Sequence, residues 1–278
     1  MTVTVTPLSA TLGARIEGID LRQTVTGAAL AALRRAFRDH QVVCLPGQKI
    51  SAANQIAFCA LFGAADSDYK VSAQRTETDY RKGVMLVSNV RKNGVPIGNL
   101  PDGDIQFHSD GCHRDRPYLA TTLYAIRVPR RGGDTLFANL TAAYDALDAD
   151  TKARLEGCRI HNSYVLDATS RDEKPPPGAV LHEATHPLVL THPDTGRKAL
   201  YLNRLMSRWI VGLPREEGAP LLDQLLDHVE RPEFIYAHKW TPGDFLMWDN
   251  RCVNHARTDF PSDEVRLLRR YTISESAA

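Results

Sequence analysis

The amino-acid sequence predicts a mainly β fold, a β-sandwich or jelly roll with helices packed around it. Three observations support this. Short apolar runs with strand character recur along the chain, only a few stretches have helical spacing, and glycines and prolines separate the runs. Of the 278 residues, 43% are hydrophobic and 24% are charged, as in ordinary globular proteins. A chain of this length can bury a large core, and we expect residues 1–278 to form a single domain.

The first elements alternate between strands and helices. Residues 3–20 have the pattern of strand, turn and strand. A helix is expected over residues 29–37, preceded by Thr26 as a potential cap, and a buried strand over residues 41–47, which end in Pro-Gly. Ser51 is placed to cap a second helix that runs to Phe62.

The middle of the chain has long polar loops between strands. Residues 64–83 are polar and irregular, and residues 91–104 are rich in glycine, proline and asparagine. Between them, residues 85–90 form an apolar run that predicts a strand. Residues 118–128 and 134–140 predict two more strands, separated by a turn that contains Gly-Gly.

The last elements include two helices and the remaining strands. Residues 144–157 and 214–231 have helical patterns, the second with four leucines at helical spacing. Residues 171–179 contain three prolines, which we interpret as a surface insertion, and residues 186–203 predict a hairpin around Pro-Asp-Thr-Gly. Further strands are expected over residues 160–166, 234–240, 244–249 and 267–273.

Charge and cysteine content exclude several classes of protein. The net charge is +1, with no clustered basic excess, so we expect binding to neither nucleic acid nor an anionic membrane. The five cysteines are spread along the chain without a CxxC motif, which favours a reducing compartment, and we expect a cytoplasmic protein. The N-terminus lacks the pattern of a signal peptide, and no apolar run approaches the roughly 20 residues of a membrane span.

The stretch DIQFHSDGCHRDRP, residues 104–117, concentrates polar side chains that can bind a metal. Alternate residues of a strand point to the same face, so His108 and Asp110 can reach one ion together. Gly111 then lets the chain turn away. His255, in the distant stretch FLMWDNRCVNHARTDF, is the best third ligand. Two histidines and one carboxylate form the facial triad of non-haem Fe(II) oxygenases, which leaves positions open for co-substrate and O2.

Two arginines near the same end of the chain offer anion-binding groups. Arg266 and Arg270 lie in the strand-like stretch VRLLRRYTI, and their spacing of four places them on one face. A guanidinium group binds a carboxylate through two parallel hydrogen bonds. The same region therefore supplies a metal ligand and two cations.

Simpler interpretations of these residues remain open at this point. His108 and Asp110 could form a hydrogen-bonded pair in a polar turn, and Arg270 could pair with a neighbouring acidic residue. Cys112 and His113 raise the alternative of a zinc cluster, but no second Cys/His pair follows them. The downstream motif makes the iron site the favoured interpretation.

Taken together, these motifs resemble the TauD/TfdA family of Fe(II)/2-oxoglutarate-dependent dioxygenases. The matching stretches are FHSD, GGDTLFAN, WDNRCVNH and RLLRR, and the similarity extends over about residues 3–274. The resemblance implies a double-stranded β-helix, also called a jelly roll, in the cupin-like class. It also implies Fe(II) as the metal, 2-oxoglutarate and O2 as co-substrates, and succinate and CO2 as co-products. The family is often dimeric or tetrameric, so a homodimer or homotetramer is expected.

The resemblance also implies roles for individual residues. His108, Asp110 and His255 match the iron ligands. Thr135 and Arg266 match the residues that bind the carboxylates of 2-oxoglutarate. Arg270 matches an arginine that contacts the anionic group of the substrate. Because the carboxylate Asp110 is present, hydroxylation is expected and not halogenation.

The sequence departs from the taurine enzymes in the substrate region. Residues 66–80 offer no histidine to align with their substrate-binding histidine, and GCHR follows the HSD motif. We therefore expect a small anionic substrate other than taurine, such as a different sulfonate, a sulfate ester or an aryloxyalkanoate. Gly111, His113 and Asp104 are expected to contact it together with Arg270. Substrate choice is expected to depend on the loops 64–104 and 166–185.

Two other functions are compatible with the same motifs. The first is the same chemistry on an amino-acid or nucleoside-type biosynthetic intermediate. The second is a non-catalytic jelly-roll protein that binds a metal or an organic acid without turnover. The complete set of metal and 2-oxoglutarate residues favours an enzyme over a binding protein.

Overall fold

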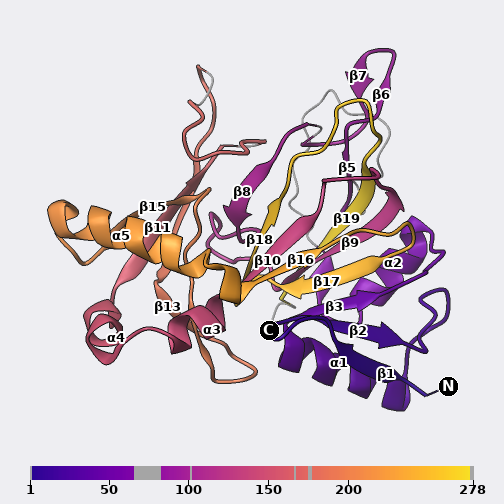
Figure 1. Cartoon of the computed structure of the whole chain (residues 1–278), viewed down its shortest axis with the longest axis horizontal. Coiled ribbons are helices and arrows are strands. Elements are labelled where there is room, and N and C mark those ends of the chain that lie inside the picture. Colours follow the sequence, from indigo (N-terminus) through magenta and orange to yellow (C-terminus); the bar gives the residue numbers. More distant parts are fainter. Residues whose placement is uncertain (1, 66–82, 101, 166, 175–176, 276–278) are drawn as a thin grey trace.

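The computed structural model of the chain describes residues 2–65, 83–100, 102–165, 167–174 and 177–275. These residues form a mainly β structure with helices around it, as predicted (Figure 1). Most of the irregular segment expected at 64–83 lies outside the described residues. Within the described part of the chain, none of the helices has the length and apolar character required to cross a membrane.

The largest sheet has eight strands and collects elements from the whole length of the chain. Its order is β1-β2-β3-β17-β9-β19-β4, and β5 also pairs with β19. β2 and β3 run parallel, and the other pairs of neighbours in this sheet are antiparallel. Its strands are β1 (Thr4–Pro7), β2 (Ala14–Glu17), β3 (Val42–Leu45), β4 (Ala64–Ala65), β5 (Val84–Ser88), β9 (Ala120–Arg127), β17 (Phe245–Asp249) and β19 (Leu267–Ser274).

A second, four-stranded sheet carries the motifs singled out in the sequence. Its order is β16-β10-β18-β8, and all its neighbours are antiparallel. The strands are β8 (Ile105–His108), β10 (Thr135–Asn139), β16 (Ile235–His238) and β18 (Val253–Arg257). β8 and β18 are 145 residues apart in sequence yet are neighbours, which brings the two histidine motifs together.

Three smaller sheets complete the β structure of the described residues. A three-stranded sheet has the order β12-β11-β15, and two hairpins pair β13 with β14 and β6 with β7. The hairpin β13–β14 is the one predicted around Pro-Asp-Thr-Gly, whereas the short hairpin β6–β7 lies within the loop expected at 91–104. The strands are β6 (Arg91–Lys92), β7 (Val95–Pro96), β11 (Arg159–Tyr164), β12 (His182–Pro187), β13 (Val189–Thr191), β14 (Lys198–Leu200) and β15 (Ser207–Val211).

The helices pack on the outside of the strands (Figure 1). α2 begins at the predicted cap, because the Ser51 hydroxyl accepts a hydrogen bond from the Asn54 amide and the Asn54 side chain accepts one from the Ser51 amide. Thr26 occupies the cap position of α1, but its side chain makes no capping hydrogen bond. The helices are α1 (Gly27–His40), α2 (Ala52–Cys59), α3 (Leu140–Asp145), α4 (Ala149–Leu155), α5 (Arg215–Val229) and the short 3₁₀ helix η2 (Pro232–Phe234).

The single helix expected over residues 144–157 is in fact two helices. Asp148 interrupts it, because its carboxylate accepts a hydrogen bond from the Thr151 amide at 2.7 Å and starts α4 as a new N-cap. In α5 the predicted leucine stripe, Leu221, Leu222, Leu225 and Leu226, is buried in the core. The same core includes Phe137 and Trp248 from the two sheets, so it supports the floor of the site described below.

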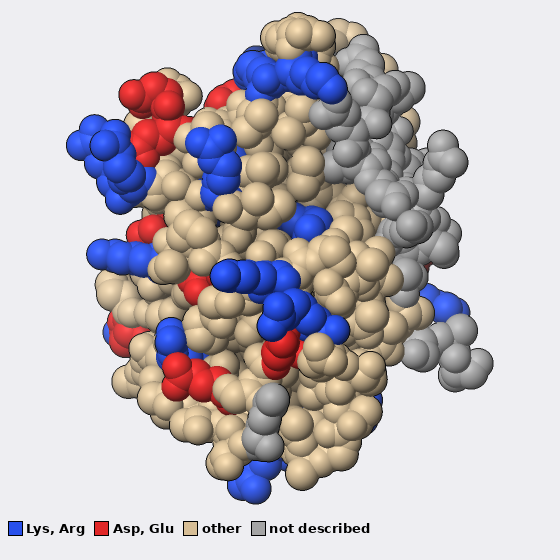
Figure 2. All heavy atoms as spheres, turned by 90° about the vertical axis from the view of Figure 1, so that its right-hand side faces the viewer, with Lys and Arg blue, Asp and Glu red and all other residues tan. Residues whose placement is uncertain are grey.

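Charged side chains are interspersed on the surface. On the face shown in Figure 2, basic and acidic side chains lie among one another. This distribution agrees with the near-neutral balance of the sequence.

Candidate metal centre and its two cavities

Two histidines face each other across neighbouring strands of the four-stranded sheet. His108 is the last residue of β8, and its Cα pairs with that of His255 in the middle of β18. Their ring centroids are 4.0 Å apart. Because the sheet register fixes both backbones, the two imidazoles are held side by side without a flexible linker.

Asp110 completes a cluster of three buried groups. Its carboxylate oxygens lie 3.9 Å from His108 Nε2 and 3.8 Å from His255 Nε2. One ligand atom from each residue lies within 4.8 Å of those of the other two. The strand ends at His108, so Asp110 reaches the cluster from the turn that follows and not, as the alternation argument assumed, from the strand itself.

The protonation states of the histidines suit metal binding. His108 Nδ1 lies 2.9 Å from the Gln106 carbonyl oxygen. A carbonyl can only accept, so Nδ1 carries the proton and Nε2 keeps its lone pair toward Asp110. Burial lowers the pKa of His108 and places that of His255 well below the ordinary value, although Asp110 opposes both shifts. Both imidazoles are therefore neutral at neutral pH, the form that binds metals.

The carboxylate of Asp110 is held from the eight-stranded sheet. Arg270 Nη2 on β19 lies 2.7 Å from Oδ1, and the Thr121 hydroxyl on β9 donates to Oδ2 at 2.7 Å. Burial alone would raise the pKa of Asp110, but Arg270, the two histidines and Thr121 together hold it well below its usual range. The cluster thus contains one ionised carboxylate and two neutral imidazoles at the boundary between the two sheets.

A small cavity of about 40 Å³ lies on one side of this cluster. Arg266 lines it and is only 2% exposed. Its Nε donates to the Gly133 carbonyl at 3.1 Å, and among the described residues no carboxylate pairs with its guanidinium. Burial, with Arg257 as a second cause, lowers the pKa of Arg266 to about 9. A buried cation without an acidic partner is costly, and an anionic ligand would offset that cost.

The other walls of the small cavity come from both sheets. Thr135 on β10 lines it, and its hydroxyl accepts a hydrogen bond from Trp240 Nε1 at 3.0 Å. Trp248 lines it as well, with its ring centroid 4.6 Å from that of His255. The remaining wall is apolar and is formed by Val87, Leu100, Ile105, Leu123 and Ala256.

A larger cavity of about 300 Å³ opens on the other side of the cluster. His108, Asp110, Arg270 and Leu100 line both cavities, so the two spaces meet at the cluster. Both predicted substrate loops contribute to the larger one, and a hydrogen bond of 3.1 Å from Asn99 to Asp167 joins them. Its lining is completed by Met85, Gly111, His113, Arg114, Tyr118, Tyr164, His182 and Met206.

Of the predicted substrate residues, Gly111 and His113 line the larger cavity, whereas Asp104 does not. Gly111 lines the larger cavity with a φ of +79°, and a Cβ there would lie 2.8 Å from the Tyr118 ring. His113 lines it too, its ring 5.0 Å from that of Tyr164. Asp104 is exposed and lines neither cavity, because it precedes the buried strand β8 at the surface. The structure does not bring Asp104 to the site.

Several residues of the site carry no motif in the sequence. Arg257 on β18 is buried and donates to the backbone carbonyls of Leu100, Asp102 and Gly103, which fixes the loop over the small cavity. Thr121 and Trp240 contact predicted site residues directly. The only signal for Arg257 was its place two residues after His255, on the same face of a strand.

Two other buried groups of metal-binding residue types occur among the described residues, Cys44 with His238 and Asp244, and His192 with Asp249 and Cys252. In each, the carboxylate already accepts protein hydrogen bonds. Asp244 accepts from Thr241, and Asp249 accepts from Arg251 through both oxygens. Asp110 likewise accepts from Thr121 and pairs with Arg270, but only the group of His108, Asp110 and His255 lines the two cavities described above. Two nitrogen donors and one oxygen donor without a thiolate fit Fe(II).

This combination of sheets, triad and flanking cavities defines a class of mononuclear metal enzymes with a facial triad. The family model described as taurine catabolism dioxygenase TauD, TfdA family, matches residues 4–272, and the chain belongs to this family. It is a 2-oxoglutarate-dependent dioxygenase of small molecules that uses Fe(II) and O2.

The similarity to the relatives extends over nearly the whole chain. An alpha-ketoglutarate-dependent 2,4-dichlorophenoxyacetate dioxygenase of Cupriavidus pinatubonensis is 33% identical over 100% of this chain and 99% of its own. An (S)-phenoxypropionate/alpha-ketoglutarate-dioxygenase of Sphingobium herbicidovorans is 33% identical over 95% and 92%. The crystal structure of AAD-2 in complex with Mn(II) and N-oxalylglycine superposes with a TM-score of 0.81 at 30% identity, over 99% of this chain and 98% of that one.

Proposed function

We propose that the protein hydroxylates a small aryloxyalkanoic acid, with 2-oxoglutarate as co-substrate. The observation that carries this proposal is the position of Arg270, a cation that lines both the small cavity and a larger cavity with aromatic walls. An acid with an aromatic ring would match that lining. Two relatives named for phenoxy acids support the same substrate class.

In this proposal His108, Asp110 and His255 hold Fe(II), which supplies the activation of O2 when bound. Their burial, their neutral imidazoles and the ionised carboxylate support the assignment. The sheet register orients the two histidines, and the contacts with Arg270 and Thr121 orient Asp110, before any ligand binds.

Arg266 and Thr135 bind 2-oxoglutarate in the small cavity. Arg266 is the buried cation without an acidic partner among the described residues, which a terminal carboxylate would satisfy through two hydrogen bonds. The Thr135 hydroxyl accepts from Trp240, so its own proton remains available to donate to a carboxylate oxygen. The apolar wall around them excludes water from the region.

The substrate occupies the larger cavity, with its carboxylate at Arg270 and its ring toward the aromatic lining. Met85, Tyr118, Tyr164 and Met206 supply apolar surface there, and Gly111 and His113 border the path to the cluster. Hydroxylation at the side-chain carbon between the ether oxygen and the carboxylate gives a hemiacetal. This product separates into a phenol and a 2-oxo acid, so release of phenol is the direct readout.

We infer that the eight-stranded and four-stranded sheets form the double-stranded β-helix expected from the family resemblance. The eight-stranded sheet joins strands near both ends of the chain, and the cluster joins residues of two distant segments, which supports residues 1–278 as one working domain. That the protein is a cytoplasmic homodimer or homotetramer which binds neither nucleic acid nor membranes stays a prediction.

The test compares phenoxyacetate with phenoxyethanol, which keeps the ring and the ether but lacks the carboxylate. Protein loaded with Fe(II) under anaerobic conditions is mixed with 2-oxoglutarate and O2. The O2 consumed and the succinate and phenol formed are then measured. Phenoxyacetate should yield succinate and phenol in equal amounts, and phenoxyethanol should yield little phenol.

The panel also includes taurine, an alkyl sulfate and an amino acid. Equal amounts of succinate and product from one of these, but none from phenoxyacetate, would refute the aryloxyalkanoate assignment and retain the enzyme class. Absence of any succinate, with or without these compounds, would contradict the catalytic assignment and favour a binding protein.

A further inference from the structure

Asn250, in the turn between β17 and β18, is linked to the metal-binding motif HSD directly through Ser109 and indirectly through Thr121. Its side-chain amide donates to the Thr121 hydroxyl at 3.0 Å, and its backbone carbonyl accepts from the Ser109 hydroxyl at 2.6 Å. Thr121 in turn donates to Asp110 at 2.7 Å. Asn250, Thr121 and Ser109 are each at most 1% exposed. We propose that Thr121 and Asn250 are positioning residues that set the orientation of Asp110 for the metal, an inference that rests on the proposed function.

The chemistry of the three groups fixes the direction of this relay. An ionised carboxylate can only accept, so the single proton of the Thr121 hydroxyl must point to Asp110. The Thr121 oxygen can then only accept from Asn250, so the amide presents its NH2 group. Asn250 therefore keeps Thr121 from turning its proton elsewhere, and the hydroxyl is a permanent donor to Asp110.

The relay also joins the two sheets. His108 and His255 belong to the four-stranded sheet, whereas Thr121 and Arg270 belong to the paired strands β9 and β19 of the eight-stranded sheet. Thr121 holds one oxygen of Asp110, and Arg270 holds the other. The position of Asp110 in the cluster is therefore set by the eight-stranded sheet, whereas the positions of the two histidines are set by the four-stranded sheet.

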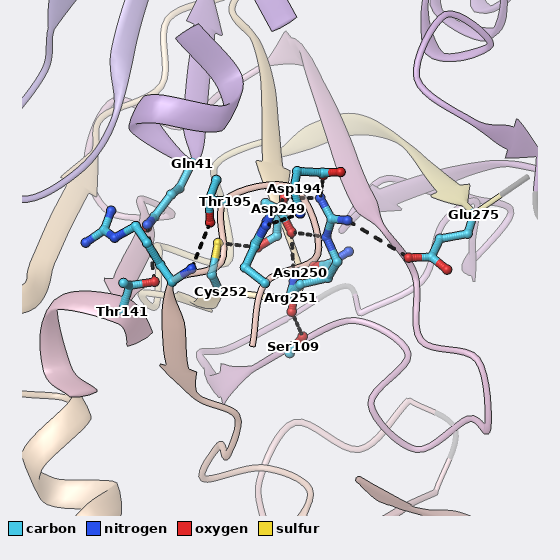
Figure 3. Close-up of polar contacts among 12 residues, drawn as sticks. Gln41, Ser109, Thr141, Asp194, Thr195, Asp249, Asn250, Arg251, Cys252 and Glu275 are labelled. Carbon is cyan, nitrogen blue, oxygen red and sulfur yellow. Dashed lines mark hydrogen bonds and ion pairs between the residues drawn. The ribbon is translucent and has the colours of Figure 1, made fainter. Parts of the chain in front are cut away.

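A buried ion pair fixes the turn that carries Asn250. Both oxygens of Asp249 accept hydrogen bonds from Arg251, at 2.9 and 2.7 Å, and His192 Nε2 lies 3.0 Å from the second oxygen. Arg251 also reaches Asp194 at 2.9 Å, and Figure 3 shows this network with the link from Asn250 to Ser109. With its neighbours fixed on both sides, Asn250 has little freedom to change its contacts.

Residues that hold a metal ligand through hydrogen bonds typically change metal affinity by about 10–100-fold when they are removed. The chain offers a matched pair of positions to test this. Thr121 and Thr122 are adjacent on β9 and both are 0% exposed, but Thr122 faces away and bonds to Gln55 and the Tyr271 carbonyl. Thr121→Val and Thr122→Val thus remove the same group from the same strand.

The experiment titrates the metal-free, full-length protein with Co(II) and follows visible absorption, while thermal melting of the metal-free protein reports folding. We expect Thr121→Val to weaken Co(II) binding by roughly 10–100-fold. Thr122→Val should stay within about 2-fold of the wild type although its melting temperature falls similarly. Thr121→Ser, which keeps the hydroxyl, should restore most of the affinity.

Equal Co(II) affinities for the two valine variants would overturn the inference, since the loss would then be unrelated to Asp110. If Thr121→Val fails to fold, Ser109→Ala removes the other contact of Asn250 with a smaller change, and it should also weaken Co(II) binding. A wild-type protein that binds no Co(II) would instead contradict the proposed function, so the two failures can be told apart.

Discussion

Arg270 Nη2 lies 2.7 Å from Asp110 Oδ1, which places a cation in direct contact with a proposed metal ligand. Two interpretations of this pair make opposite predictions. If Arg270 mainly braces Asp110, its removal should weaken metal binding. If Arg270 mainly binds the anionic substrate, its removal should reduce electrostatic repulsion of the metal ion and weaken only the binding of that substrate.

We favour the anion-binding role and predict the outcome for Arg270→Leu. Co(II) affinity should be equal to or tighter than that of the wild type. KM for the anionic substrate should rise by about 30-fold or more, since a charge-assisted pair contributes roughly 2 kcal/mol or more. Co(II) titration and steady-state kinetics measure the two quantities, and a weaker Co(II) affinity at unchanged KM would support the bracing role instead.

Removal of the carboxylate charge tests the metal assignment itself. Asp110→Asn should lower Co(II) affinity by at least about 100-fold, because an amide replaces the one anionic ligand. Asp104→Asn is the matched control, as this acid is six positions earlier in the same motif and is exposed. Titration of both variants with Co(II) measures the difference, and a similar loss in both would mean that general electrostatics dominates.

The buried arginine of the small cavity predicts a selective defect in co-substrate binding. Arg266→Lys should raise KM for 2-oxoglutarate by about 30-fold or more, because an ammonium group cannot form two parallel hydrogen bonds to a carboxylate. Arg269→Lys is the control, since Arg269 bonds to Gln55 and the Ile50 carbonyl, away from the cavity. Succinate formation at varied 2-oxoglutarate measures KM, and equal values for both variants would argue against the assignment.

His113 predicts a pH dependence of stability. Burial, followed by His182 and Arg114, lowers the pKa of His113 to about 4. The unfolded chain, with a pKa near 6.5, binds more protons between these two values, so stability falls as pH decreases from about 6.5 to 4. In His113→Phe this loss should be smaller. Melting temperatures of the metal-free wild type and of the variant from pH 7 to 4.5 measure how stability changes with pH. The same pH dependence in both proteins would mean that other histidines cause it.

The ion pair behind the metal-binding turn predicts a large effect on stability. Arg251→Met leaves Asp249 buried without its main partner and should lower the free energy of unfolding by about 3–5 kcal/mol. Arg15→Met breaks a comparable pair with Glu17 at the surface and should cost less than about 1 kcal/mol. Urea denaturation of both variants measures the difference, and equal small losses would show that the buried pair is not important for folding.

The sequence was sufficient to predict the residues that carry a motif. FHSD and WDNRCVNH predicted the three clustered side chains, although the end of β8 and the start of β18 are 145 positions apart in sequence. Only the fold pairs these two strands and sets their register. The predicted elements were mostly confirmed, because apolar spacing and capping residues are local signals. The split between α3 and α4 was missed because Asp148 suits both a helix surface and a cap.

The residues that were missed lack such a local signal. Thr121 and Arg257 look like ordinary strand residues, and Asn250 lies within WDNRCVNH but had no predicted role. The partners of all three lie in other parts of the chain. Sheet order decides which of them meet, and single-sequence patterns do not specify sheet order. Asp104 shows the converse, since its place in a polar motif suggested a role while the start of β8 leaves it at the surface.

The shared wall of the two cavities has a consequence for inhibition. Leu100, His108, Asp110 and Arg270 border both spaces, so these shared side chains form the boundary between the co-substrate and the substrate there. A single molecule that joins a dicarboxylate to an aryl group by a short linker would occupy both at once. Such a bisubstrate compound should compete with each natural ligand separately, and its selectivity among related enzymes would come from the aryl end.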